Sequence, residues 1–317
     1  MENSSLTLAL NSSASKSGCD EWLDMTFLVL DGLLSGVIII GNGVTCLILL
    51  RNSHFRSCFM NTFLVSLAVA DILVAVFVMP GEVIFCTSCS QPVSEYCWLI
   101  GSVRYFVFSA TKLNLLAITY DRYTAVMSPL RYNAKINLKK VISILSLVWT
   151  FPMILTLSRL VWWIKLPRHQ ALYADRIFNT CLMFSLVTLP VAVLLVANLR
   201  IVLEIRKQHR RVSTMDKASV TETCSSSNNA SNKHRRKTSR QAGRKGTTAC
   251  VLVVFIFVMC WFPRGLYNIF RLFGKEGPLL RELSLFFLFV QSAINPFVYS
   301  FYRTDFRRAL VRLLRCR

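Results

Sequence analysis

The stretch of sequence that decides the fold is residues 97–123, CWLIGSVRYFVFSATKLNLLAITYDRY. It is largely apolar from Cys97 to Tyr120, and this length can cross a bilayer, because about 20 helical residues span the hydrocarbon core. It closes on Asp121 and Arg122, a carboxylate beside a guanidinium that is always charged. Charged residues at membrane depth are rare and usually functional. The stretch therefore predicts a transmembrane helix whose charged end serves a function.

Six further windows of this kind predict an all-α membrane protein, a seven-transmembrane helix bundle. The chain of 317 residues is 54% hydrophobic and only 17% charged, which is more apolar than a soluble domain. Seven long windows joined by mostly short polar loops also disfavour a soluble core of buried helices. The windows are 25–50, 58–84, 97–127, 138–160, 176–205, 248–272 and 279–302.

The net charge of +21 predicts an orientation rather than a nucleic-acid partner, because of where the charge lies. Of the 37 Lys and Arg residues, 25 fall in segments that alternate with the windows and therefore share one side of the membrane. Positive loops stay cytoplasmic, so we expect a multi-pass plasma-membrane protein with its N-terminus outside and its C-terminus inside. The basic surface would face anionic lipid and cytosolic partners. These segments are 51–56, 129–140, 200–245 and the residues after 302.

Residues 1–24 are rich in Ser and Asn and predict an extracellular tail. They contain no apolar segment typical of a signal peptide, so we expect the window at 25–50 to act as the signal. Asn3 and Asn11 each begin an Asn-X-Ser sequence, which makes them predicted glycosylation sites on the outer side.

The domain formed by the windows, residues 25–302, includes one long cytoplasmic loop at 206–247. The centre of this loop is polar and predicts disorder. Residues 303–317 predict a cytoplasmic amphipathic helix and tail that lie along the membrane surface, with Cys316 as a palmitoylation candidate. The apolar face of that helix comprises Phe306, Leu310 and Leu313.

Short motifs recur along the windows in a fixed order. They are Gly41-Asn42, Leu67 to Asp71, Asp121-Arg122-Tyr123, Trp149, Pro190, Cys260-Trp261-Phe262-Pro263 and Asn295-Pro296 to Tyr299. With the motifs in this order, the chain resembles a class A (rhodopsin-like) G-protein-coupled receptor over nearly its whole length. Within that class it resembles the amine-receptor branch. The resemblance implies a receptor and not an enzyme. It would pass the signal of a small extracellular ligand to a heterotrimeric G protein, with receptor kinases and arrestin acting on the 206–247 loop.

The resemblance also implies the parts of a switch. It gives coupling to the G protein to Asp121, Arg122, Tyr123, Asn295, Pro296 and Tyr299. It makes Asp71 an allosteric sodium site with Thr111 and Asn295, since hard oxygen ligands suit such an ion. No other cofactor is implied. The alternative for Asp71 is a buried acid kept neutral by desolvation.

The expected ligand pocket departs from the amine-receptor pattern at Arg104. This residue shares a helical face with Arg122, about 27 Å away at 1.5 Å per residue, and stands where amine-binding members carry Asp. A guanidinium cannot pair with an ammonium, so Arg104 and Arg264 favour a small anionic ligand. The expected pocket comprises Arg104, Glu82, Phe108, Trp261, Arg264, Asn268 and Phe289.

An alternative reading has these arginines neutralised internally by Glu82 or Asp31, because a buried unpaired charge is costly. The chain would then be an amine-type or orphan receptor. Raised basal activity is a further expectation, since Asn198 stands where the family usually has a Tyr that meets Arg122. An ion transporter or channel is less favoured, because only Asp71 and Lys112 point to it and no repeated halves are visible.

The disulfide and Lys112 are the least settled features. Cys97 matches one half of the family's usual disulfide, but the outer loop expected at 159–175 contains no cysteine. Cys181 is the nearest candidate partner, and connectivity does not follow from sequence. The other outer cysteines are Cys19, Cys86 and Cys89. Lys112 lies mid-window, either deprotonated or reaching Asp71.

Overall fold

A computed structural model describes most of the seven windows. The described residues are 21–51, 59–86, 96–182, 185, 189–220, 251–252, 254–271, 273–275, 277–302 and 304–315, with backbone alone at 208–220. The predicted glycosylation sites Asn3 and Asn11, the palmitoylation candidate Cys316 and the polar centre of the 206–247 loop lie outside these ranges.

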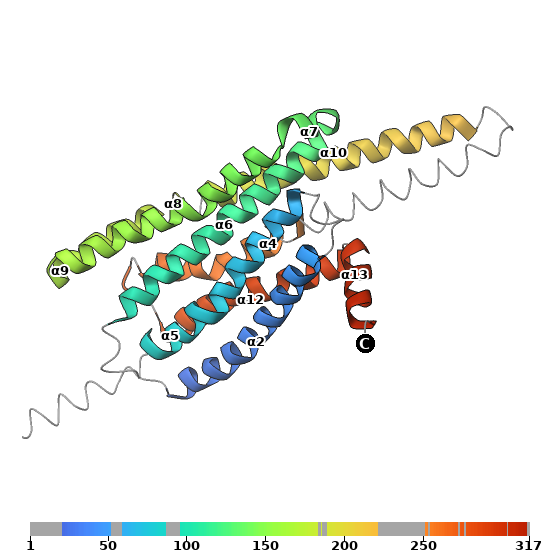
Figure 1. Cartoon of the computed structure of the whole chain (residues 1–317). Helices are drawn as coiled ribbons and strands as arrows, with labels where there is room; N and C mark the ends of the chain where they lie inside the picture. Colours follow the sequence, from blue (N-terminus) through green and yellow to red (C-terminus); the bar gives the residue numbers. More distant parts are fainter. Residues whose placement is uncertain are drawn as a thin grey trace, which may run out of the picture.

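The described residues form an elongated bundle of helices, in which every window is helical wherever it is described (Figure 1). Among the described residues, four helices are long and apolar enough to cross a membrane by length and composition: Trp22–Arg51, Phe59–Cys86, Leu138–Lys165 and Pro278–Phe301. The helix that carries residues 97–123 packs on α4, α8 and α10, while α12 packs on α2. The helices are α2 (Glu21–Arg51), α4 (Phe59–Leu73), α5 (Met79–Cys86), α6 (Cys97–Met127), α7 (Tyr132–Lys135), α8 (Leu138–Lys165), α9 (Arg168–Leu182), α10 (Leu189–Val220), a helix over 254–271, α12 (Pro278–Tyr302) and α13 (Thr304–Arg315).

The helix boundaries differ from the expected ones in the fourth and fifth windows. The outer loop expected at 159–175 is reduced to Leu166 and Pro167, because α8 continues to Lys165 and α9 begins at Arg168. Proline suits the start of a helix, and the Pro167 carbonyl accepts the first bond of α9 from the N–H of Ala171 at 3.0 Å. The window 176–205 includes the last seven residues of α9 but misses residues 168–175, because that part of the helix is polar. The α10 backbone also continues to Val220, well past the expected end of the fifth window at 205.

Pro80 shapes the second window. The five residues Val74–Val78 form a π-helical segment, in which the N–H of Met79 bonds to the Val74 carbonyl. The carbonyl of Ala75 then has no backbone donor, because Pro80 has no N–H. The hydroxyl of Ser35 on α2 donates to this carbonyl at 3.2 Å. The π segment is thereby held to the first helix.

Pro296 joins α12 to α2 in a similar way. Proline removes the helical bond to the carbonyl four residues earlier, which is Ser292. The amide of Asn42 donates to this carbonyl at 3.1 Å. Gly41 permits the approach, because a Cβ there would lie 3.0 Å from the Pro296 ring. The Gly41-Asn42 motif therefore serves to dock the first helix on the seventh.

The helix α13 turns away from the end of α12 (Figure 1). Phe306 and Ala309 are buried against the bundle, whereas Arg307 and Arg308 are exposed. This is the amphipathic arrangement that the sequence predicts for a helix lying along the membrane surface.

Candidate ligand and switch sites

A cavity of about 510 Å³ opens between α5, α6, α8, α9, the 254–271 helix and α12. Positive side chains dominate its lining. Six arginines line it, against two carboxylates, Glu82 and Asp175. The arginines are Arg104, Arg159, Arg168, Arg264, Arg271 and Arg281. Of the residues expected in the pocket, Arg104, Glu82 and Arg264 lie here. Asn268 is half-buried and outside this lining.

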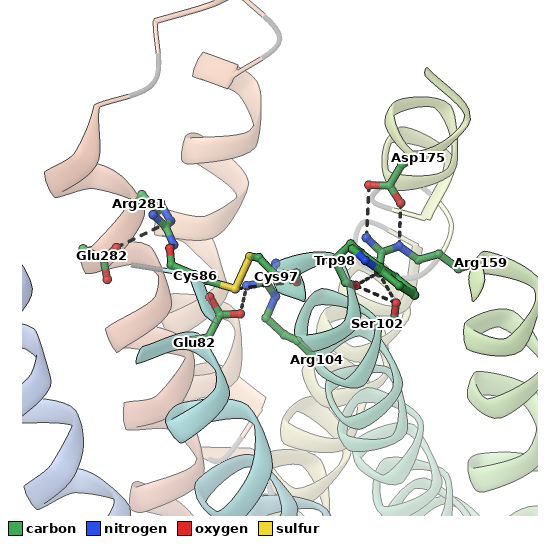
Figure 2. The surroundings of a disulfide bond; sticks show 10 residues. All are labelled: Glu82, Cys86, Cys97, Trp98, Ser102, Arg104, Arg159, Asp175, Arg281 and Glu282. Atoms are coloured by element: carbon green, nitrogen blue, oxygen red, sulfur yellow. Dashed lines mark hydrogen bonds and ion pairs between the residues drawn. A yellow bond between two sulfur atoms is a disulfide. The ribbon is translucent and has the colours of Figure 1, made fainter. Parts of the chain in front are cut away.

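Arg104 forms an ion pair with Glu82, in which a guanidinium nitrogen donates to Oε1 (Figure 2). Both side chains are largely buried. The structure thus adopts the internal pairing that the sequence left open, with Glu82 and not Asp31 as the partner. The second carboxylate oxygen of Glu82, Oε2, is buried and has no hydrogen-bond partner.

Arg264 differs from Arg104, because no ion pair to a described carboxylate is present. Its guanidinium donates to the hydroxyl of Ser284 at 3.2 Å and lies 4.8 Å from the centre of the Tyr267 ring. Arg281 donates to the carbonyl of Cys86 and lies 3.6 Å from Glu282. Arg264 is therefore the lining cation best able to accept an anion from outside.

Arg159 organises the other side of the cavity, although sequence reasoning passed over it. It is only 4% exposed. It donates to both oxygens of Asp175, at 2.6 and 3.2 Å, to the carbonyl of Trp98 at 2.8 Å, and to the hydroxyl of Ser102 (Figure 2). A charge near the outer end of the apolar window 138–160 was the available signal. Its partner Asp175 lies in the first part of α9, which precedes the window 176–205.

The disulfide prediction of Cys97 with Cys181 is wrong. Cys97 is bonded to Cys86 (Figure 2). Cys181 is an exposed free thiol. Cys86 ends α5 and Cys97 begins α6, so that their Cα atoms lie 5.0 Å apart. That separation suits a disulfide. The bond therefore closes the connection between the second and third windows, and does not tie α6 to the segment before α10.

Below the cavity lies a column of aromatic side chains. The ring centroid of Trp261 lies 5.8 Å from that of Phe108 and 5.7 Å from that of Phe257. Phe289 stacks on Phe108 at 6.4 Å. The indole N–H of Trp261 donates to Gln291 at 3.1 Å. The pocket residues Phe108, Trp261 and Phe289 thus lie together beneath the arginines.

Lys112 joins this aromatic column. Its ammonium lies 4.0 Å from the centre of the Trp261 ring, a cation–π arrangement. The expectation that Lys112 reaches Asp71 is not met in the described structure, where the ion pairs do not include it. The lysine instead contacts the tryptophan that the resemblance makes a ligand sensor.

Asp71 is fully buried, and its Oδ2 accepts a hydrogen bond of 2.7 Å from the amide of Asn295. Its other oxygen, Oδ1, accepts no hydrogen bond that meets the usual distance and angle limits. Thr111, also expected here, is fully buried and donates to the Val107 carbonyl at 3.1 Å. A buried carboxylate oxygen is the kind of hard ligand that suits such a cation.

At the opposite end of α6, Asp121 is held by two groups. The guanidinium of Arg122 donates to its Oδ2 at 2.6 and 3.0 Å, and the hydroxyl of Tyr132 on α7 donates to its Oδ1 at 2.7 Å. Asn198 donates to the carbonyl of Leu194 within α10. Tyr123 lines an apolar groove between α6 and α10, and Tyr299 is buried. Arg122 is therefore held by Asp121 on its own helix, and Tyr132 of α7 holds that carboxylate in turn.

These features define a membrane receptor built on seven helices. The family model described as 7 transmembrane receptor (rhodopsin family) matches residues 41–299, and the chain belongs to this family. Among its relatives, the D(1A) dopamine receptor of Xenopus laevis is 29% identical over 92% of this chain and 74% of the relative. The D(1A) dopamine receptor of Didelphis virginiana is 28% identical over 92% and 75%. The D(1) dopamine receptor of Carassius auratus is 28% identical over 92% and 90%.

Membership of this family carries the general function. The protein is a multi-pass plasma-membrane receptor that signals through a G protein, and it is not an enzyme. Its ligand is a separate question, because the outer cavity carries Arg104 where an amine receptor has a carboxylate.

Proposed function

We propose that this receptor recognises a small anionic ligand in the outer cavity. The observation that carries the proposal is the charge of the lining, six arginines against two carboxylates. Arg264 is the main anchor, because it has no described carboxylate partner and a guanidinium binds carboxylate or phosphate through two parallel hydrogen bonds. Arg104 is the second anchor, once the ligand acid displaces Glu82.

The signal then passes from Arg104 to the aromatic column. Phe108 lies one helical turn below Arg104 on α6, and its ring meets Trp261 edge-on at 5.8 Å. Trp261 lies two residues before Pro263, and Pro263 and Pro296 interrupt the helical bonding of their spans. Moving Arg104 away from Glu82 therefore shifts the population of inner-half conformations that the G protein meets.

A second candidate ligand is an amine. The relatives named above are dopamine receptors, and Oε2 of Glu82 is an unpartnered buried acceptor. An ammonium in contact with Glu82 would have to compete with Arg104, which already pairs with the same carboxylate. The net positive charge of the cavity disfavours an isolated amine.

Further parts of the proposal rest on the sequence and on the family. Asp71, with Thr111 and Asn295, holds an allosteric sodium ion, supported by the buried Oδ1 of Asp71. The N-terminus, with Asn3 and Asn11 glycosylated, lies outside and the C-terminus, with Cys316 palmitoylated, inside. Receptor kinases and arrestin act on the 206–247 loop, and membrane lipid contacts the basic inner surface.

The test is second-messenger output, as cyclic AMP and calcium, in cells expressing the wild type, Arg264→Gln, Arg104→Asp or Arg122→Ala. Carboxylate and phosphate panels are compared with an amine panel. We expect acids to act on the wild type, with potency about 10- to 100-fold lower for Arg264→Gln and no output from Arg122→Ala. Arg176→Gln, which removes an exposed arginine of α9 outside the cavity lining, is the matched control. Activation by amines and not by acids would show the ligand class to be wrong.

A further inference from the structure

A second, much smaller cavity adjoins the ligand cavity between α2, α5 and α12. Its volume is about 20 Å³, which is room for one water-sized group. Four carboxylates line it, together with Arg281; they are Asp24, Asp31, Glu82 and Glu282. The rest of the lining is apolar and includes the rings of Phe27 and Phe289. A cavity of this size admits a single small polar group and no more.

Two acceptors in this cavity have no partner. Oδ1 of Asp31 and Oε2 of Glu82 make no hydrogen bond, although the two residues are only 8% and 6% exposed. A buried unsatisfied acceptor costs more than a satisfied one contributes, and the cost is larger on a carboxylate. Asp31 also has no ion pair with any described residue, whereas Glu282 lies 3.6 Å from Arg281. The small cavity therefore presents two buried carboxyl oxygens that lack a hydrogen-bond donor.

The small cavity and the large one share a wall. Glu82 and Arg281 line both of them. The carboxylate of Glu82 points one oxygen to Arg104 and leaves the other without a partner. The two cavities therefore adjoin at Glu82 and Arg281.

We propose that the ligand is a zwitterion of the amino-acid type, with its anion on Arg264 and Arg104 and its primary ammonium in the small cavity. The inference rests on the proposed function and specifies its ligand. An ammonium carries three donors, enough for Oδ1 of Asp31 and Oε2 of Glu82, and the two phenyl rings suit a cation. A metal ion is less suited, since the described residues contain no group of three His, Cys, Asp or Glu side chains spaced to hold one.

The size of the small cavity makes the inference specific. Three methyl groups on the nitrogen exceed the space of one water molecule and remove every donor. The structure therefore separates three probes of equal length: an ω-amino acid, its deaminated acid and its N-trimethyl derivative. β-Alanine, 4-aminobutanoate and 5-aminopentanoate provide a series of lengths.

The experiment measures binding of these probes to the purified full chain in lipid nanodiscs by isothermal titration and thermal shift, beside cyclic AMP output in cells. Asp31→Asn removes one carboxylate of the small cavity without touching Arg104. Glu204→Gln, which removes one carboxylate from the cytoplasmic half of α10, is the matched control. We expect one amino acid of the series to bind about 10- to 100-fold more tightly than its deaminated and trimethylated analogues. Asp31→Asn should remove that preference and leave the affinity for the simple acid unchanged.

Each of the other outcomes contradicts one part of the proposal. If the acid and the amino acid bind equally and Asp31→Asn alters neither, the small cavity holds a water or a protonated carboxyl, and only the anionic ligand stands. If the trimethylated probe binds as well as the amino acid, the ammonium lies elsewhere. If the simple amine binds as tightly as the amino acid, the anionic ligand itself fails. If no probe binds, the zwitterion inference fails, and the acid panel above decides the proposed function separately.

Discussion

Lys112 places an ammonium in the middle of the bundle, against an indole and without an ion pair to a described carboxylate. Lysine near the bilayer centre costs about 2.5–3.5 kcal/mol on insertion scales, and a cation–π contact offsets about 0.5–2 kcal/mol of that. The contact with Trp261 therefore compensates only part of the cost. Because Trp261 belongs to the 254–271 helix, this contact links a charge on α6 to the position of that helix.

We predict that Lys112→Met raises the free energy of unfolding by about 1–2 kcal/mol, because methionine fills a similar volume without the charge. Thermal unfolding of the purified receptor measures this as a higher melting temperature. Lys139→Met, an exposed lysine near the start of α8, is the control and should leave it unchanged. A lower melting temperature for Lys112→Met would show that the ammonium has a stabilising partner.

Arg104 shows what the sequence could predict about single residues and what it could not. Its helical face follows from spacing along one helix, and its charge follows from the residue type. These two properties left open an anionic ligand or internal pairing with Glu82 or Asp31. The choice between the two acids depends on how α2 and α5 are placed around α6, which no local pattern encodes. The pairing of Arg159 with Asp175 was missed for the same reason, since it joins two helices.

At the scale of elements, the windows themselves were predictable and the connections were not. Hydropathy locates helices that are apolar over about 20 residues. It misses the first part of α9, which carries Arg168 and Asp175, and it misses the continuation of α10 along a polar sequence. The partner of Cys97 could not be predicted either, because it depends on where α5 ends relative to α6. The motif positions, in contrast, are local and were identified directly.

The helix α9 is attached to the bundle mainly through charge and aromatic stacking. Asp175 accepts from Arg159 and from the indole of Trp163, which stacks on Trp98 at 5.4 Å between centroids and 8° between planes. We predict that Asp175→Asn lowers the free energy of unfolding by about 2–4 kcal/mol, because Arg159 is then left buried without its carboxylate.

Hydrogen exchange locates this effect. Residues 168–182 should exchange faster in Asp175→Asn than in the wild type, because a segment with fewer stabilising contacts opens more often. Arg176→Gln, an exposed charge on the same helix, is the control. Unchanged exchange over 168–182 would mean that aromatic packing alone holds α9.

At the scale of the whole molecule, charge is arranged in two positive regions. One is the outer cavity with its six arginines, and the other is the set of basic segments that the sequence places inside. The aromatic column and the prolines connect these regions through the bundle. In the proposed function, a change of pairing at the cavity arginines is passed along this column to Arg122.

We predict that Tyr132→Phe raises ligand-independent signalling severalfold, because Asp121 loses one of its two donors and restrains Arg122 less. Basal cyclic AMP and calcium, corrected for receptor number at the cell surface, measure this. Tyr173→Phe changes an exposed tyrosine of α9 in the same way and should leave basal output unchanged. Equal basal output from Tyr132→Phe and the wild type would assign the restraint to other contacts.

The disulfide between Cys86 and Cys97 lies within the connection between α5 and α6. The two sides of the cavity rim therefore differ in their sensitivity to reductants. A disulfide of this loop length adds roughly 2–4 kcal/mol to stability, and a reductant would loosen the ends of α5 and α6, where the Cys86 carbonyl also receives Arg281. The α9 side has no described disulfide to the bundle, and the ion pair that holds it, Arg159 with Asp175, is largely buried. A reducing environment would therefore loosen one wall of the cavity and leave the opposite wall in place.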